Sequence, residues 1–303
     1  MNVARILKVI RLHIVAGGFL AFSLGALLAV AGGTSFSLLR FGFGYIAVFL
    51  GDLSTHYSND YFDVAIDKYT GRKRLFSGSK ILVDNPSLLS LSRHISLGLL
   101  AGSTVLAVAF VIFLGAPLEF FIVMFVASLI GWLYSAPPAR LVSRGLGELA
   151  VAFVTGFAIP GLGYLAIRGQ FDPVFVCFAV PFTMYGLILS LSLHAPDVEI
   201  DRKVGKRNLV VRLGQCRVFF LTLAMALSAT LIFCICAWQN VRSVIDFDVV
   251  VLLSIVPLIA GLLGLAGFSK KKEVNRSSAL NIAALFVFNM LMISYLLVIV
   301  LVV

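Results

Sequence analysis

Aspartates gather in two short segments of a chain that otherwise contains little charge. The first segment reads NDYFDVAIDKYTG, from Asn59 to Gly71, and the second reads DVEIDRKVG, from Asp197 to Gly205. Together they hold six of the 14 acidic residues in the chain. Neighbouring carboxylates repel one another unless cations neutralise them, so these two segments are the first candidates for chemistry.

Four-residue steps place the main members of each segment on one helix face. These members are Asn59, Asp63 and Asp67 in the first segment, and Asp197 and Asp201 in the second. Asp60 and Glu199 point away from these faces, and we expect them to be solvated or to support the others. Pro196 is expected to end the preceding helix, so that Asp197 opens a new turn.

The chemistry that suits these side chains is the binding of a metal-diphosphate. Mg²⁺ takes oxygen ligands, usually one or two carboxylates plus substrate phosphates. Basic residues follow each acidic segment, and arginine in particular binds phosphate with two parallel hydrogen bonds. The basic residues are Arg72, Lys73, Arg74, Arg202, Lys203, Lys206 and Arg207. The alternative is that both segments are solvated helix ends that only mark the membrane surface.

A diphosphate held at a membrane surface indicates a polyprenyl diphosphate as the substrate. Metal-bound diphosphate is a good leaving group, because the ions neutralise the charge that builds on the bridging oxygen. Loss of an allylic diphosphate leaves a carbocation that must be kept from water. An interior with 26 Phe and 8 Tyr is suited to exclude water and to hold the prenyl chain.

The rest of the sequence predicts an all-α integral membrane protein. Only 13% of the residues are charged and the mean hydropathy is +1.05, whereas soluble domains have about 25% charged residues. A membrane-spanning helix needs about 20 mostly apolar residues, and lipid requires every backbone amide to be bonded internally. We predict nine spans, at about Leu7–Val30, Leu38–Ser58, Leu88–Leu114, Glu119–Tyr134, Leu146–Ile167, Val174–Ala195, Val218–Trp238, Val249–Phe268 and Ala279–Val303.

The basic residues predict the orientation of these spans. With the amino terminus inside, all of the 24 Lys and Arg except Arg40, Arg168 and Arg242 fall on the inner side. This asymmetry predicts that both acidic segments face the cytoplasm of a cell membrane. The net charge of +10 suits anionic headgroups or an anionic substrate, and no nucleic-acid-binding motif accompanies it.

The layout predicts one domain, residues 1–303, made of two related halves. Each acidic segment follows an even-numbered span, the second or the sixth, and runs into a basic loop that contains glycine. We therefore expect four-helix halves at about 1–144 and 145–276 and a final helix at about 279–303. Facing halves would bring the two acidic segments together at one mouth, capped by cytoplasmic loops.

NDYFDVAID and DVEID resemble the two signature motifs of the UbiA superfamily of intramembrane aromatic prenyltransferases. The resemblance covers nearly the whole chain, including YSAPPARLVSRGLGELAV between the motifs. Within the superfamily, GLGEL (Gly145–Leu149) and DRKVGKRNLVVRLG (Asp201–Gly214) resemble the menaquinone-type branch, which prenylates dihydroxynaphthoate.

The resemblance implies specific roles for residues of this chain. It implies a Mg²⁺–diphosphate, or Mn²⁺ in place of Mg²⁺, and a lateral opening to the membrane lipids. The metal-binding residues would be Asn59, Asp63, Asp67, Asp197 and Asp201, and the four aspartates among them would be the catalytic residues. Arg72, Arg140 and Arg11 match phosphate-binding or first-helix positions of the family, and Tyr134 heads a segment that lines the site. An electron-rich ring carbon would attack the allylic cation.

Two departures from the family pattern leave the acceptor open. Lys73–Gly78 reads KRLFSG where the family commonly has Ser or Thr and then Arg-Pro, and Leu193–Pro196 reads LHAP where the naphthoate branch has Asn and Arg. His194 either faces the acceptor or makes a structural bond at the helix end. One alternative is geranylgeranyl transfer to a glycerol phosphate ether, and another, from a different class, is a cation-coupled transporter.

Overall fold

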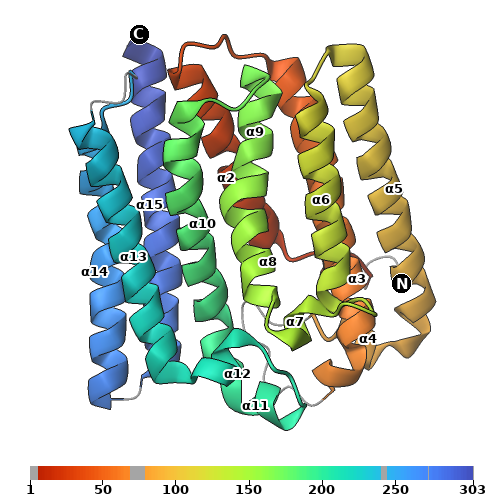
Figure 1. Ribbon diagram of the computed structural model, residues 1–303. Helices are drawn as coiled ribbons and strands as arrows, with labels where there is room; N and C mark the ends of the chain where they lie inside the picture. Colours follow the sequence, from red (N-terminus) through yellow and green to blue (C-terminus); the bar gives the residue numbers. More distant parts are fainter. Residues whose placement is uncertain (1–5, 69–78, 240–243, 272, 303) are drawn as a thin grey trace.

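The computed structural model is all-helical over the residues that it describes, which are 6–68, 79–239, 244–271 and 273–302 (Figure 1). Its α-helices are α2 (Leu12–Ala31), α3 (Leu38–Asp67), α4 (Ile81–Asp84), α5 (Leu89–Leu114), α6 (Leu118–Ser135), α7 (Leu141–Arg144), α8 (Gly147–Phe153), α9 (Ile159–Arg168), α10 (Pro173–His194), α11 (Val198–Lys203), α12 (Leu209–Leu213), α13 (Gln215–Trp238), α14 (Phe247–Lys271) and α15 (Val274–Val302). Shorter 3₁₀ turns are η1 (Leu7–Val9), η2 (Pro86–Leu88) and η4 (Ala195–Asp197), and η3 (Val154–Ala158) is a π-helical turn.

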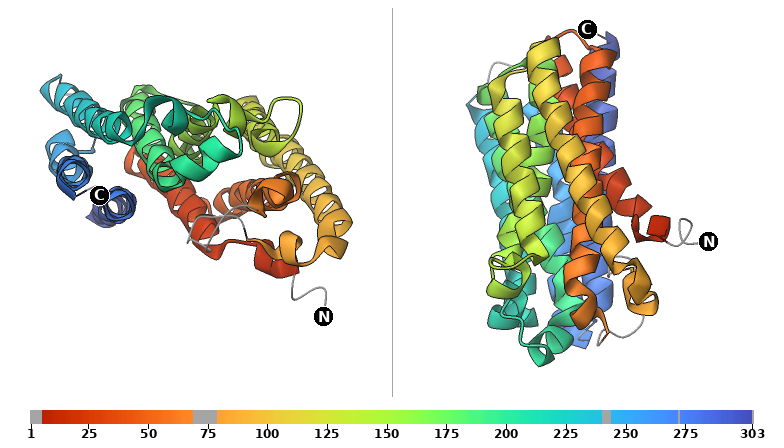
Figure 2. Two further views of the ribbon diagram at one scale, coloured as in Figure 1. Left: turned by 90° about the horizontal axis from the view of Figure 1, so that it is seen from below. Right: turned by 90° about the vertical axis from the view of Figure 1, so that its right-hand side faces the viewer.

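The long helices confirm the predicted architecture of a membrane protein. Nine helical spans within the described ranges are long and apolar enough to cross a membrane. They run side by side, and the short helices α4, α7, α11 and α12 gather at one end of the molecule (Figure 1). Seen end-on from that side, α11 and α12 lie across the ends of the long helices (Figure 2).

Two helix boundaries near the acidic segments decide where the carboxylates lie. The second span does not end near Ser58 as predicted, because α3 continues without a break to Asp67. No glycine or proline interrupts the sequence between these residues, so the polar turns simply extend the helix beyond the apolar run. The prediction for Pro196 is confirmed, since α10 ends at His194 and η4 carries Asp197 into α11.

Helices α2 and α9 pack against each other at backbone distance in the middle of the fold. A Cβ atom at Gly25 would lie 1.8 Å from the carbonyl oxygen of Pro160, and one at Gly163 would lie 2.0 Å from that of Phe22. Only glycine allows this approach, as in other closely packed membrane helices. The apolar core continues from this pair in both directions, toward Phe110 in α5 and toward Phe288 in α15.

Candidate active site

The two acidic segments meet at a single cavity. Its volume is about 430 Å³, and helices α2, α3, α6, α8, α9, α10 and α15 contribute to its walls. The five predicted ligand residues all line it, three from the end of α3 and two from the η4–α11 segment: Asn59, Asp63, Asp67, Asp197 and Asp201. Continuous helix in α3 explains the first set, because residues four apart share one face.

Asp63 and Asn59 present oxygen atoms that nothing in the described part of the chain satisfies. The hydroxyl of Ser135 donates to Oδ2 of Asp63 at 2.7 Å. The other carboxylate oxygen, Oδ1, and Oδ1 of Asn59 are buried and have no hydrogen-bond partner there. Buried oxygens without partners are costly, and carboxylate and amide oxygens are the ligands that Mg²⁺ takes. These residues therefore fit a divalent cation.

Asp201 is held more completely than Asp63. Its Oδ1 lies 3.2 Å from Nζ of Lys206, and its Oδ2 accepts a 2.7 Å hydrogen bond from the side-chain amide of Asn208. Lys206 also lines the cavity, so its ammonium group is within reach of both a carboxylate and an anionic ligand. Asn208 was not among the predicted site residues, although an asparagine before an apolar run is a typical N-cap, and Asn208 caps α12.

Glu148 is a second residue that the sequence analysis missed. It is fully buried, and its Oε1 accepts hydrogen bonds from the backbone amides of Leu209 and Val210, at 2.8 and 3.3 Å. These are amides of the first turn of α12, which lack partners inside the helix. Glu148 thus fixes α12 against α8, and α12 carries the cap residue Asn208 that holds Asp201.

We expect Glu148→Ala to lower the free energy of unfolding by about 1–3 kcal/mol, since it leaves the backbone amides of Leu209 and Val210 without their acceptor. Glu148→Gln keeps an acceptor oxygen and is the matched control, with a smaller loss. Thermal unfolding of the purified proteins in one detergent would measure both. An equal loss for the two variants would contradict the role given to the Oε1 atom.

Asp60 is buried and not solvated, so the structure supports the second of the two roles expected for it, that of a residue that supports others. Its side chain is 3% exposed and forms an ion pair with Arg11. The hydroxyl and the backbone amide of Ser79 also donate to it. Asp60 therefore ties α3 to the chain before α2 and to the chain before α4, contacts that span 49 and 19 residues. Glu199, by contrast, is exposed as expected.

Arg11 lines the cavity with its guanidinium group directed to Asp60. The resemblance implied a substrate role for Arg11, and in the structure this cation stands beside the acidic face of α3. Arg140 precedes α7 and has a left-handed backbone conformation (φ 43°). Its positive charge and that of Lys206 are both close enough to attract the carboxylate of Asp63. Arg72, the predicted phosphate ligand of the first basic loop, lies outside the described residues.

Tyr134 and His194 face each other across the cavity mouth. The phenol oxygen of Tyr134 lies 3.3 Å from Nε2 of His194, and Nδ1 of that histidine lies 2.8 Å from the carbonyl oxygen of Ser190. Because a carbonyl only accepts, Nδ1 carries the proton and Nε2 accepts from the tyrosine. His194 thus makes the structural bond at the helix end. It also lines the cavity, and its contact with an acceptor stays a prediction.

The electrostatics at the end of α3 favour a bound cation. Burial and the nearby charges of Asp60 and Asp63 raise the pKa of Asp67 to about 6. A cation would oppose this shift by favouring the ionised carboxylate. Among the described residues, no three His, Cys, Asp or Glu side chains stand close enough to hold one metal ion by themselves. A cation here would thus need further ligands, such as phosphate oxygens.

Comparisons with known proteins identify the family and the fold of the chain. A model of the UbiA prenyltransferase family matches residues 19–293. A structure of a UbiA homolog from Archaeoglobus fulgidus bound to GPP and Mg²⁺ has 19% identity and a TM-score of 0.73, covering 98% of this chain and 99% of that chain. A structure of digeranylgeranylglyceryl phosphate synthase has 16% identity and a TM-score of 0.71, covering 99% of both chains.

One curated relative extends the comparison to a plant protein. A probable homogentisate phytyltransferase 2 of Oryza sativa subsp. japonica is 33% identical over 99 residues, which is 30% of this chain and 26% of the rice protein. The chain thus spans about a quarter of the length of that relative. The family model, in contrast, covers nearly all of the chain. The chain therefore belongs to the UbiA prenyltransferase family, a family of membrane-embedded transferases of prenyl groups.

Proposed function

We propose that this protein transfers a polyprenyl group from an allylic prenyl diphosphate to an electron-rich aromatic acceptor. The observation that carries the proposal is the meeting of the two acidic segments at one cavity that also has an apolar wall. The acceptor that its GLGEL and DRKVGKRNLVVRLG segments favour is dihydroxynaphthoate, as in menaquinone biosynthesis. Membership of the UbiA prenyltransferase family argues against the alternative of a cation-coupled transporter.

In this proposal the acidic face holds the donor by its diphosphate. Mg²⁺ would be held by Asn59, Asp63, Asp67, Asp197 and Asp201, and it would supply neutralisation of the charge that develops on the departing diphosphate. Lys206 stands at the cavity and is placed to contact a phosphate oxygen. The phosphate role predicted for Arg72 stays a prediction, as do the roles of Arg11, Tyr134 and Arg140.

The apolar wall of the cavity would hold the prenyl chain and exclude water. Val151, Val154 and Ile159 line it from the α8–η3–α9 segment, and Leu189 and Leu193 line it from α10. The bond between the allylic carbon and the diphosphate oxygen breaks with its electron pair leaving on the diphosphate. A ring carbon of the acceptor then donates a π-electron pair to form the new carbon–carbon bond, and the proton of that ring carbon is lost.

We further propose that the chain is a single domain of two related halves with the cavity mouth on the cytoplasmic side. The asymmetric distribution of Lys and Arg supports this orientation. The short helix α7 follows the fourth span, and α11 and α12 follow the sixth span. Many of the Lys and Arg residues lie in these two connecting segments. Labelling of a single introduced cysteine in intact cells or inverted vesicles would test the orientation.

Mass spectrometry of the products tests the proposed reaction. Purified protein would receive geranylgeranyl diphosphate, Mg²⁺ and one of three acceptors: dihydroxynaphthoate, homogentisate or a geranylgeranylglyceryl phosphate. We expect a prenylated aromatic product and no digeranylgeranyl ether. Formation of the ether alone would contradict an aromatic acceptor, and the absence of any product would contradict prenyl transfer.

A further inference from the structure

The polar face of α3 continues into the membrane beyond the acidic segment. Asp52 and His56 precede Asn59 by seven and three residues, so all three lie on one side of the helix. Both residues line the cavity. At 1.5 Å per residue, Asp52 lies about 10 Å along the helix axis from Asn59, toward the middle of the span. The mechanism described above gives neither residue a role.

Asp52 is a carboxyl group inside a membrane span, and it lies beside an imidazole at more than normal hydrogen-bond distance. Its Oδ1 lies 3.6 Å from Nε2 of His56, and its side chain is 23% exposed, whereas that of His56 is 4% exposed. Asp52 belongs to the span Leu38–Ala65. Ionisable groups at such depth are costly, and they mark functional sites by default.

The backbone of α2 leaves room next to this carboxyl group. A Cβ atom built on Gly18 would lie 3.9 Å from Oδ2 of Asp52, so any larger side chain there would occupy the space beside that oxygen. Gly17 and Gly18 both line the cavity. Oδ1 faces the histidine and Oδ2 faces this space, which makes Oδ2 the atom placed to accept a hydrogen bond from a bound molecule.

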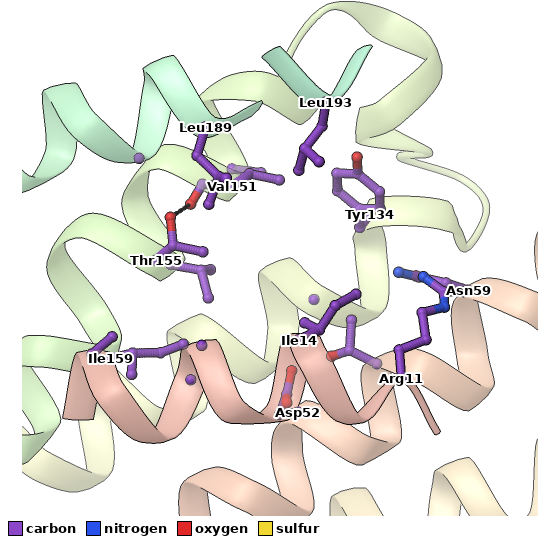
Figure 3. A pocket seen from close by; sticks show the side chains of 18 of the residues that line it. Arg11, Ile14, Asp52, Asn59, Tyr134, Val151, Thr155, Ile159, Leu189 and Leu193 are labelled. Carbon is purple, nitrogen blue, oxygen red and sulfur yellow. Dashed lines mark hydrogen bonds between the residues drawn. The ribbon is translucent and has the colours of Figure 1, made fainter. Parts of the chain in front are cut away.

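The cavity has two chemically different walls at this depth. Figure 3 shows Asp52 next to Arg11 and Ile14, with Asn59 along the same helix. The opposite wall shows Val151, Thr155 and Leu189, and the hydroxyl of Thr155 is already bonded to the carbonyl oxygen of Val151 at 2.8 Å. A prenyl chain is suited to the apolar wall, because it offers no donor to a carboxylate.

We propose that Asp52, with His56 behind it, forms the subsite for a hydroxyl group of the acceptor. This inference rests on the proposed function and narrows its substrate class to a ring that directs an O–H group toward α3. An acceptor ring placed between Asn59 and Asp52 would have one edge beside the allylic carbon of the prenyl diphosphate. The hydroxyl group on its other edge would lie beside Asp52. A carboxylate of the acceptor would be repelled by Asp52, so it points elsewhere.

The test compares acceptors that differ only at the hydroxyl group. Wild-type protein in lipid nanodiscs would receive geranylgeranyl diphosphate, Mg²⁺ and either dihydroxynaphthoate or homogentisate, whichever it prenylates, and then the O-methyl ethers of that acceptor. We expect one ether to have a KM about tenfold to a hundredfold higher, the range for losing a hydrogen bond to a charged group.

The variants assign that discrimination to Asp52. Asp52→Leu should raise the KM of the hydroxyl acceptor by a similar factor and leave that of the ether unchanged, so that discrimination disappears. Asp52→Asn keeps an acceptor oxygen without the charge and should be intermediate. Gly18→Val fills the space beside Oδ2 and should also reduce discrimination between the hydroxyl acceptor and its ether. This variant provides the test if Asp52→Leu does not fold.

Two controls separate this subsite from the donor site. Thr104→Val, in α5 away from the residues that line the cavity, should change neither KM, and binding of a geranylgeranyl thiodiphosphate should be the same in Asp52→Leu as in wild type. Full discrimination in the folded Asp52 variants would overturn the hydroxyl subsite alone. Absence of product with every acceptor in wild type would overturn the proposed function and the subsite with it.

Discussion

Asp63→Ala is expected to lower prenyl-transfer turnover by about a hundredfold to a thousandfold, the usual effect of removing one group that stabilises charge in a transition state. The variant should still fold. Asp63 is bonded to a single side chain, Ser135, and its Oδ1 is a buried oxygen with no partner among the described residues. Removing the side chain eliminates this unsatisfied oxygen and loses one hydrogen bond, and it also removes a proposed ligand of the diphosphate-bound cation.

The other three carboxylates of the acidic segments are expected to behave in the same way. These are Asp67, Asp197 and Asp201, each replaced by alanine. Glu199→Ala is the matched control, because it lies between two of them and is exposed; we expect near wild-type turnover. Product formation, with expression and thermal stability measured in parallel, checks the series. Wild-type turnover in the Asp63→Ala variant would contradict the role of the acidic face in prenyl transfer.

Asp60→Ala separates a structural role from a metal-binding role. Because Asp60 holds Arg11 and Ser79, its loss leaves a partly buried guanidinium group without its partner. We therefore expect lower thermal stability as well as some loss of turnover. Relative to wild type, the apparent affinity of the Asp60→Ala variant for Mg²⁺ in the presence of donor should change less than that of the Asp63→Ala variant. An equal change in Mg²⁺ affinity would show that Asp60 belongs to the metal-binding set.

The hydropathy and spacing of the sequence predicted the elements well, because both are local properties. Nine long apolar runs became nine spans in the described chain, and a four-residue step put Asn59, Asp63 and Asp67 on one face of α3. The prediction that two distant acidic segments meet rested on their matching positions after two spans, and they do line one cavity. The division into two halves stays a prediction.

Contacts between segments that are far apart in the sequence could not be predicted from local hydropathy and spacing. Arg11 and Asp60 are 49 residues apart, and nothing in the local pattern around either one indicates a pair. Glu148 bonds to the backbone of Leu209, and a backbone partner leaves no trace in residue types. Asp52 was missed for another reason: it is a single charge within an apolar run, and its meaning depends on the cavity that other helices form around it.

Removal of divalent cations is expected to abolish prenyl transfer, and to do so reversibly. The acidic face concentrates carboxylates around one cavity, and without a cation the carboxylates would repel an incoming diphosphate. Excess EDTA should therefore reduce turnover to background, and added Mg²⁺ or Mn²⁺ should restore it. Undiminished turnover in EDTA would contradict a metal-diphosphate site.

The arrangement of the carboxylates also predicts the order of binding. No three acidic, histidine or cysteine side chains in the described ranges form a ready-made metal site, and Asp201 is occupied by Lys206 and Asn208. Mg²⁺ commonly completes its ligands with substrate phosphates, so the cation should bind tightly only together with the donor. Titration with Mn²⁺, followed by electron paramagnetic resonance, would compare protein alone with protein plus geranylgeranyl thiodiphosphate. We expect tight Mn²⁺ binding only in the second case, and its loss in Asp63→Ala. Equally tight binding without the thiodiphosphate would mean that the carboxylates alone form the metal site, through a rearrangement of the acidic segments.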